Sequence, residues 1–139
     1  MYSFATTRRV LYGETDQMGF LYYGNYGLYY EMGRNEAIRN LGISYKELEA
    51  MGIIMPVVEL HAKYLRPAKY DDLITIKTTV LTLDEANIIS FYCELFNEQN
   101  KLLNSSTTQL VFFDTQLKTT VAMPSILRNK LAPFFENDK

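Results

Sequence analysis

Asp16 stands just before a stretch rich in glycine and tyrosine that leads into a predicted helix. A carboxylate at such a place can act as a nucleophile or as a general base. The unpaired N–H groups at a helix start can stabilise negative charge that develops on a carbonyl oxygen. The segment from Tyr12 to Glu31 therefore predicts acyl chemistry. The alternative is that Asp16 is a turn residue whose carboxylate accepts hydrogen bonds from nearby backbone N–H groups.

Other reactive side chains are few. The chain has one cysteine, Cys93, and one histidine, His61. A single cysteine forms no internal disulfide, and these two side chains are too few for a zinc site, so we expect no metal. Cys93 falls on the apolar face of a predicted strand, where we expect a buried, inert thiol rather than a nucleophile. His61 falls on the polar side of its strand, where we expect a surface or subunit-contact residue.

Length and composition indicate one globular domain. The chain has 139 residues, of which 47% are hydrophobic and 22% charged, enough for one core and too few for two ordinary domains. Its apolar runs are far shorter than the roughly 20 residues that cross a bilayer, and its first residues do not look like a secretory signal. We therefore expect a cytoplasmic protein without a membrane span. The net charge of -2 and the lack of a dense basic stripe argue against nucleic acid as a partner.

The segment from 26 to 41 is predicted to be a helix. Its apolar and small residues recur at spacings of three and four, which places them on one helical face. These residues are Tyr26, Tyr29, Tyr30, Gly33, Ala37 and Leu41. The small residues Gly33 and Ala37 make the helix narrow on this face, as expected if a curved sheet packs closely around it.

Flanking residues set the ends and the outer side of this helix. Asn25 is expected to cap its start, and Gly42 to end it. Arg34, Asn35 and Arg39 are predicted to point away from the apolar face. The helix is thus expected to begin shortly after the Asp16 turn.

Two acidic residues near Asp16 admit two interpretations. Glu14 is interpreted as a charge at a strand end, and Glu31 as an ion-pair partner on the helix. The alternative is that either side chain orients Asp16 or a water molecule beside it.

Alternation of apolar and polar residues predicts a sheet. The first strand is expected from Arg9 to Glu14, and further strands at 58–64, 73–83, 87–97 and 102–113. The last three are about eleven residues long, against a usual five or six. A short helical turn is expected at 44–51, and a last helix near Pro124, with Ile126, Leu127 and Leu131 packed on the body.

Strands of this length curl, and a curled sheet needs something inside it. The helix at 26–41 is the long helical pattern available. The predicted fold is therefore α+β, with a long curved antiparallel sheet wrapped around one central helix, which is the hot-dog fold. Such a domain leaves an open sheet edge, so we expect it to pair into a dimer.

The order of residues from Tyr12 to Tyr26 resembles a known family. An acidic residue, Thr15 and Asp16 precede a Gly-containing turn, which is followed by Tyr23 and the Asn25–Tyr26 pair. This pattern is similar to that of the hot-dog acyl-CoA thioesterases of the 4-hydroxybenzoyl-CoA thioesterase type, including the branch associated with the bacterial Tol-Pal system. The match spans 9–134. It is supported by Glu31 with Arg34 on the helix and by the segments 64–68 and 70–72.

The resemblance implies a mechanism. Asp16 would be the catalytic carboxylate, attacking a thioester carbonyl or activating a water, and the Tyr23 backbone N–H would polarise the carbonyl oxygen. Neither a metal nor an organic cofactor would be required. The substrate would be an acyl-CoA or an acyl carrier, bound between two subunits of a homodimer that assembles into a dimer of dimers, a homotetramer. Substrate-binding residues on matching positions would be Gly24, Asn25, Tyr26, Glu31, Lys63 and Arg66.

Two features depart from that family. Many members of the Tol-Pal branch have His where this chain has Tyr23, so an imidazole base is excluded there. A basic cluster for the coenzyme A phosphates is replaced by the acidic stretch 84–87. Phosphate contacts would then come from Lys63, Arg66, Lys69 or Arg128, or the carrier is not free coenzyme A.

A rival of another class is a non-catalytic hot-dog module that binds acyl carriers or partner proteins. Hydratases and dehydratases of this fold typically use a His with an acidic partner, and His61 lies outside the motif. Loss of turnover on Asp16→Asn with the fold retained separates the enzyme from the module.

Overall fold

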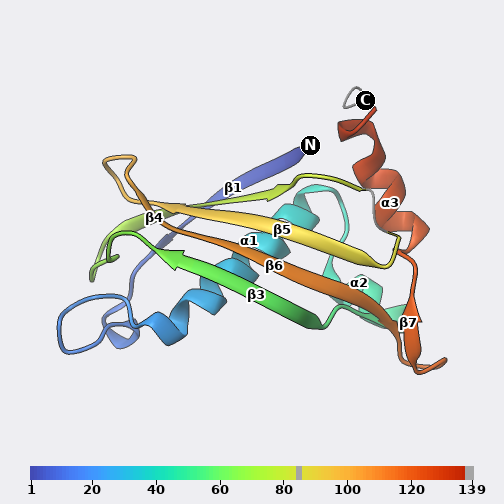
Figure 1. Ribbon diagram of the computed structural model, residues 1–139, viewed down its shortest axis with the longest axis horizontal. Coiled ribbons are helices and arrows are strands. Elements are labelled where there is room, and N and C mark those ends of the chain that lie inside the picture. Colours follow the sequence, from blue (N-terminus) through green and yellow to red (C-terminus); the bar gives the residue numbers. More distant parts are fainter. Residues whose placement is uncertain (84–85, 137–139) are drawn as a thin grey trace.

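The computed structural model describes residues 1–83 and 86–136. Within these residues the sheet has seven strands, and its main path runs β1-β4-β5-β6, with β3 on the far side of β6 (Figure 1). All strand pairs are antiparallel. The strands are β1 (Tyr2–Arg9), β2 (Ile53–Ile54), β3 (Val57–Tyr64), β4 (Leu73–Val80), β5 (Ile88–Phe96), β6 (Leu102–Asp114) and β7 (Thr119–Val121).

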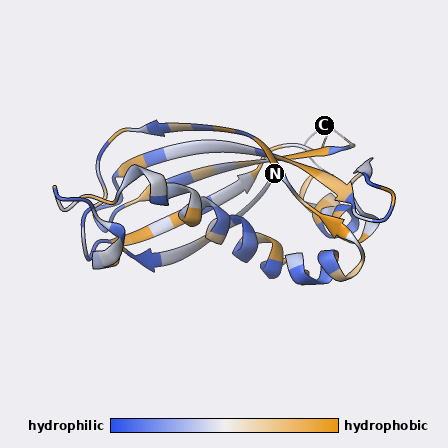
Figure 2. Cartoon of the chain, turned by 90° about the horizontal axis from the view of Figure 1, so that it is seen from below, coloured by the Kyte–Doolittle hydropathy of each residue, from blue (hydrophilic) through white to orange (hydrophobic). Residues whose placement is uncertain are grey.

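The long helix α1 (Tyr26–Asn40) lies along one side of the curved sheet (Figure 2). Its buried residues include Tyr26, Tyr29, Tyr30, Gly33 and Ala37, the face that the spacing predicted. Gly33 is the point of close approach, because a Cβ there would lie 2.7 Å from Cγ2 of Ile76 on β4. The hot-dog fold is thereby confirmed, with α1 as its central helix.

Two short helices complete the chain. Helix α2 (Tyr45–Ala50) is capped by Ser44, whose Oγ accepts from the Glu47 N–H at 3.1 Å. Helix α3 (Ser125–Leu131) follows Pro124 and buries Leu127 and Leu131 against the body. Ile126 is more exposed than expected, because Leu127 and Leu131, four residues apart, form the buried face of this helix and Ile126 lies beside that face. In the described part of the chain, no helix is long and apolar enough to cross a membrane.

The expected first strand was misplaced. Strand β1 ends at Arg9, where the prediction began, and pairs with β4 along its whole length. Residues 12–14 form a tight 3-10 turn instead, because the Glu14 side chain turns back and accepts from the Leu11 N–H at 2.9 Å. Strands β2 and β7 were missed because two or three residues are too short to show alternation.

Two expectations about α1 were wrong. Asn25 does not cap the helix through its side chain, because a 3-10 turn at Tyr23–Asn25 runs directly into α1 and the Asn25 amide is used elsewhere. Arg34 does not point outward and is only 8% exposed. It turns toward Tyr45 on α2, close enough to influence that hydroxyl, and forms no described ion pair with the exposed Glu31.

Strand β3 is an edge of the sheet. It pairs with β6 on one side only among the described strands. Its apolar residues Val58, Leu60 and Tyr64 alternate as predicted, yet each is about half exposed, at 56%, 48% and 54%. An apolar row on an open edge is available to a further protein surface.

Candidate active site

The segment between β1 and α1 forms a compact loop that carries Asp16. Thr15 bridges to Leu21 across the loop, and the Asp16 N–H donates to the Phe20 carbonyl at 2.8 Å. Gly19 closes the tip, and its φ of 78° is one that L side chains rarely adopt. The loop therefore turns back on itself and presents the Asp16 side chain at a fixed point.

The Asp16 carboxylate is held on one side. Its Oδ1 accepts from the Met18 N–H at 2.9 Å and from the Phe20 N–H at 3.2 Å. No described residue donates a hydrogen bond to Oδ2. The turn-capping interpretation of Asp16 is therefore correct for one oxygen, and the other remains available for chemistry.

Asp16 lines a cleft of about 370 Å³ between the loop, the start of α1 and the end of β3. The walls include Phe20, Leu21, Tyr23 and Tyr26 from the loop and helix side. The opposite wall is Tyr64 and the turn Leu65, Arg66 and Pro67 that follows β3. An apolar cleft with a carboxylate at its edge fits an acyl group whose reactive carbon lies beside Asp16.

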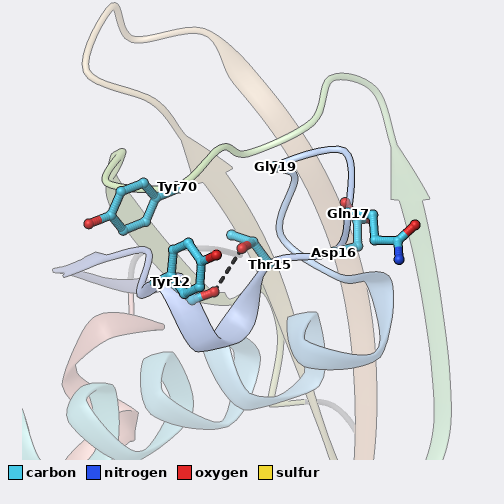
Figure 3. A pocket seen from close by; sticks show the side chains of 6 residues that line it. All are labelled: Tyr12, Thr15, Asp16, Gln17, Gly19 and Tyr70. Atoms are coloured by element: carbon cyan, nitrogen blue, oxygen red, sulfur yellow. Dashed lines mark hydrogen bonds between the residues drawn. The ribbon is translucent and has the colours of Figure 1, made fainter.

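A second hollow is formed by the same loop, and Asp16 lines this one too (Figure 3). The Tyr12 and Tyr70 rings meet edge to face at 5.6 Å, and the Thr15 hydroxyl donates to the Tyr12 carbonyl. Its volume is larger, about 640 Å³. Its lining includes the polar side chains of Thr15 and Gln17, whereas the first cleft is lined mainly by apolar and aromatic side chains, which suit an acyl group better.

The start of the helical region offers backbone donors to the first cleft. Tyr23 begins the 3-10 turn that continues into α1. Its N–H donates to no described residue, whereas the N–H groups of Tyr22 and Asn25 are both used. Tyr23, which carries this N–H, lines the same cleft as Asp16.

Tyr26, the first residue of α1, forms part of the cleft wall. Its ring contacts Tyr64 edge to face, with centroids 5.1 Å apart. Burial raises the pKa of Tyr26, a backbone hydrogen bond with Ala68 opposes this, and the Tyr64 and Asp16 side chains add to it. The hydroxyl is therefore a neutral donor and acceptor at physiological pH.

The structure brings together only part of the expected site. Asp16, Tyr23, Tyr26 and Arg66 line the cleft, with Arg66 also donating to the Leu102 carbonyl at 3.1 Å. Residues that lie outside this cleft are Gly24, Asn25, Glu31 and Lys63.

These four residues have contacts or positions elsewhere in the molecule. The Asn25 amide donates to the Glu14 carbonyl at 2.9 Å, and Gly24 packs against the Tyr22 ring. Glu31 is exposed on α1. Lys63 lies with the exposed His61 in a different hollow on the sheet. The acidic stretch 84–87 includes Asp84 and Glu85, which lie outside the described residues.

Sequence reasoning missed the apolar walls Leu65 and Pro67. The segment 64–68 was noted only as part of the family pattern, and nothing local indicates that it lies opposite Asp16. Among the described residues, no cluster of His, Cys, Asp or Glu is suited to hold a metal ion.

Cys93 is buried on the inner face of β5, as expected. Burial raises the pKa of its thiol to about 12. With that pKa, only about one thiol in ten thousand is ionised at pH 8, and the thiolate is the reactive form. We therefore expect no labelling of the native protein by iodoacetamide at pH 8, and full labelling after unfolding in guanidinium. Rapid labelling of native protein, measured by mass spectrometry, would contradict this assignment.

Comparison with known proteins places the chain in a family. The family model described as the thioesterase-like superfamily matches residues 10–131. The chain belongs to the thioesterase-like superfamily. The match begins just after β1 and includes the Asp16 loop, α1 and strands β2 to β7.

Individual known proteins are similar to this one over most of its length. A putative acyl-CoA thioesterase, YneP of Bacillus subtilis, is 30% identical over 107 residues, covering 77% of each chain. The acyl-CoA thioester hydrolase YbgC of Escherichia coli is 29% identical over 116 residues, covering 84% of this chain and 86% of that protein. The solved structure of a DHNA-CoA thioesterase from Staphylococcus aureus has a TM-score of 0.84 at 29% identity. The match covers 98% of this chain and 88% of that one. The expected resemblance to hot-dog acyl-CoA thioesterases is confirmed, and the assignment to the Tol-Pal branch stays a prediction.

Proposed function

We propose that this protein is an acyl-CoA thioesterase, which hydrolyses a thioester to a free acid and a thiol. The observation that carries the proposal is the Asp16 carboxylate, which lines an apolar cleft and has one oxygen held by backbone N–H groups, while no described residue donates to the other. The similar proteins YneP and YbgC, whose names state acyl-CoA thioester chemistry, support it.

The chemistry follows from the two groups at the cleft. Asp16 either attacks the thioester carbon or removes a proton from a water that attacks it. Negative charge then develops on the carbonyl oxygen, and the Tyr23 N–H stabilises that charge. If Asp16 attacks, the carbon–sulfur bond breaks, the thiolate takes a proton from water, and a water molecule then hydrolyses the mixed anhydride on Asp16 to release the acid and restore the carboxylate. If Asp16 acts as the base, the water oxygen bonds to the acyl carbon, the carbon–sulfur bond breaks, and the thiol leaves with the proton that Asp16 removed.

The remaining site residues have supporting roles in this proposal. Tyr26 forms the aromatic wall of the acyl cleft, and Arg66 lies on its rim, where a phosphate or carrier would approach. Gly24 and Asn25 shape the backbone beside Tyr23, since both belong to the 3-10 turn. Glu31 and Lys63 lie outside the cleft of a single chain, so they would contact substrate only from a second subunit.

We further propose that the protein works as a homodimer through β3, with two dimers forming the tetramer. The open edge and the half-exposed row of Val58, Leu60 and Tyr64 support this arrangement. Tyr64 belongs both to this row and to the cleft wall. A partner on this face would therefore close the side of the cleft that a single chain leaves open.

The dimer proposal predicts the effect of a charge on the inner face of β3. We expect Leu60→Lys to weaken dimerisation by at least about a hundredfold, since a buried unpaired charge costs several kcal/mol. Sedimentation velocity over a concentration series measures this. His61→Lys adds a charge to the outer face of the same strand and should leave the assembly unchanged. A wild-type monomer, or equal effects of both variants, would contradict the proposal.

The function is tested by thiol release from short, medium, long and aromatic acyl-CoAs, followed with a thiol reagent. Release from at least one class is expected. Parallel assays with the same acyl groups on acyl carrier protein distinguish the two carriers. Tight binding of an acyl carrier without release would instead support a non-catalytic module.

A further inference from the structure

A buried carboxylate lies two residues before Asp16. Glu14 is 9% exposed, and its side chain accepts three hydrogen bonds. The Leu11 N–H donates at 2.9 Å, the Tyr29 hydroxyl donates at 2.8 Å, and the Arg8 guanidinium forms an ion pair with the second oxygen. The Glu14 side chain thus joins β1, the loop and α1.

The backbone carbonyl of Glu14 also accepts hydrogen bonds from the far end of the same loop. Its carbonyl oxygen accepts from the Tyr22 N–H at 2.9 Å and from the Asn25 amide at 2.9 Å. Glu14 therefore contacts Tyr22 and Asn25, the residues on either side of the Tyr23–Gly24 pair. Only Thr15 separates Glu14 from Asp16, so the carboxylate and the free N–H are both placed with respect to Glu14.

Tyr29 is held in the donor state that this contact needs. Burial raises the pKa of Tyr29, and the neighbouring Glu14 carboxylate raises it further, while Arg8 opposes this. The hydroxyl therefore stays protonated at physiological pH. The Arg8 guanidinium also lies over the Tyr29 ring, 4.7 Å from its centroid.

Stability alone is a poor explanation for this cluster. A buried ion pair loses much of its Coulomb energy to desolvation, and apolar residues of similar size often stabilise a fold as well. An apolar cluster, however, would not fix the direction of the loop. The hydrogen bonds of Glu14 to β1, to α1 and to the loop itself do fix the direction of the loop, since each bond requires a particular geometry.

We propose that Glu14 is a positioning residue, which through Arg8 and Tyr29 holds the Asp16 carboxylate and the Tyr23 N–H at the spacing that thioester hydrolysis needs. This inference rests on the proposed function of Asp16. Glu14 itself does not line the cleft and is assigned no contact with substrate.

The test uses Glu14→Gln and Tyr29→Phe in the full chain, with thiol release measured at a temperature where thermal denaturation shows every variant folded. Gln keeps the size of Glu14 and removes its charge. Phe keeps the buried ring and removes only the donor, so it guards against a variant that fails to fold. Glu36→Gln is the matched control, since it removes an exposed ion pair with Arg39 on the same helix.

We expect kcat to fall about 10- to 100-fold in both variants with a much smaller change in KM, since a misplacement of about 1 Å can cost a hundredfold. The double variant should lose little more than Glu14→Gln alone, because both changes act through one contact. Glu36→Gln should keep wild-type kcat.

Three results would overturn the inference. One is wild-type kcat in Glu14→Gln despite a lower melting temperature, which indicates a purely structural role. Another is a multiplicative loss in the double variant, which indicates independent roles. The third is a rise in KM with kcat unchanged, which indicates substrate contact. Absence of thiol release from the wild type would instead count against the proposed function, so the two failures are distinguishable.

Discussion

Replacing Asp16 by Asn should remove most of the thiol release while leaving the fold intact. The Asn side chain has the same size, and its carbonyl oxygen can accept from the Met18 and Phe20 N–H groups as Oδ1 does now. What is lost is the ionised second oxygen, which acts as nucleophile or base. Loss of such a group lowers turnover by about 10²- to 10⁴-fold. Steady-state kcat of wild type and variant, with circular dichroism to compare their folds, measures this.

The chain offers a matched control for this change. Asp114, at the turn after β6, uses Oδ1 in the same way, accepting from Gln116 N–H at 2.8 Å and from Leu117 N–H at 2.9 Å. Asp114→Asn should therefore keep wild-type turnover. If Asp16→Asn also keeps it, another group does the chemistry. If both variants lose activity in proportion to lost stability, the effect is one of folding.

The second large effect is expected at Gly33, where α1 meets the sheet. A methyl group there would overlap Oγ1 of Thr78 and lie 2.7 Å from Cγ2 of Ile76. Both are β-branched residues on β4, whose side chains have little freedom to move away. Overpacking of this kind costs about 1–3 kcal/mol. Gly33→Ala should therefore lower the free energy of unfolding, measured by urea denaturation at a fixed protein concentration.

Gly27 on the same helix supplies the comparison. A Cβ at Gly27 would meet no atom within 4 Å. Gly27→Ala should gain up to about 1 kcal/mol, because Ala has the higher helix propensity. The free energies of unfolding of the two variants should then differ by roughly 1–4 kcal/mol, with Gly33→Ala the less stable. Equal gains in both would mean that α1 does not lie as close to β4 as the structure places it.

Asp16→Asn and Gly33→Ala together separate catalysis from architecture. Asp16→Asn is expected to change turnover with little change in stability, and Gly33→Ala to change stability. A variant that changed both would indicate that the loop before α1 depends on how closely the helix docks. Glu14 joins these two parts of the molecule, since it contacts both the loop and Tyr29 on α1.

Local patterns were sufficient for the elements that repeat a simple period. The face of α1 and the inward residues of β4 and β5 follow spacings of three to four and of two, so the sequence predicts them directly. Asp16 was identified because a carboxylate beside glycines and a helix start is a local arrangement. These features depend on residues close together in the chain.

Tertiary structure alone decided which residues lie opposite Asp16 and which charged side chains are buried. The turn at Leu65 to Pro67 forms the other wall of the cleft because β3 ends beside the Asp16 loop, and this depends on the curvature of the whole sheet. Arg34 and Glu14 look like surface charges in the sequence, yet both are buried. Their environment is supplied by residues from other elements, Tyr45 for one and Arg8 and Tyr29 for the other. Burial is a property of distant segments brought together, which no local period encodes.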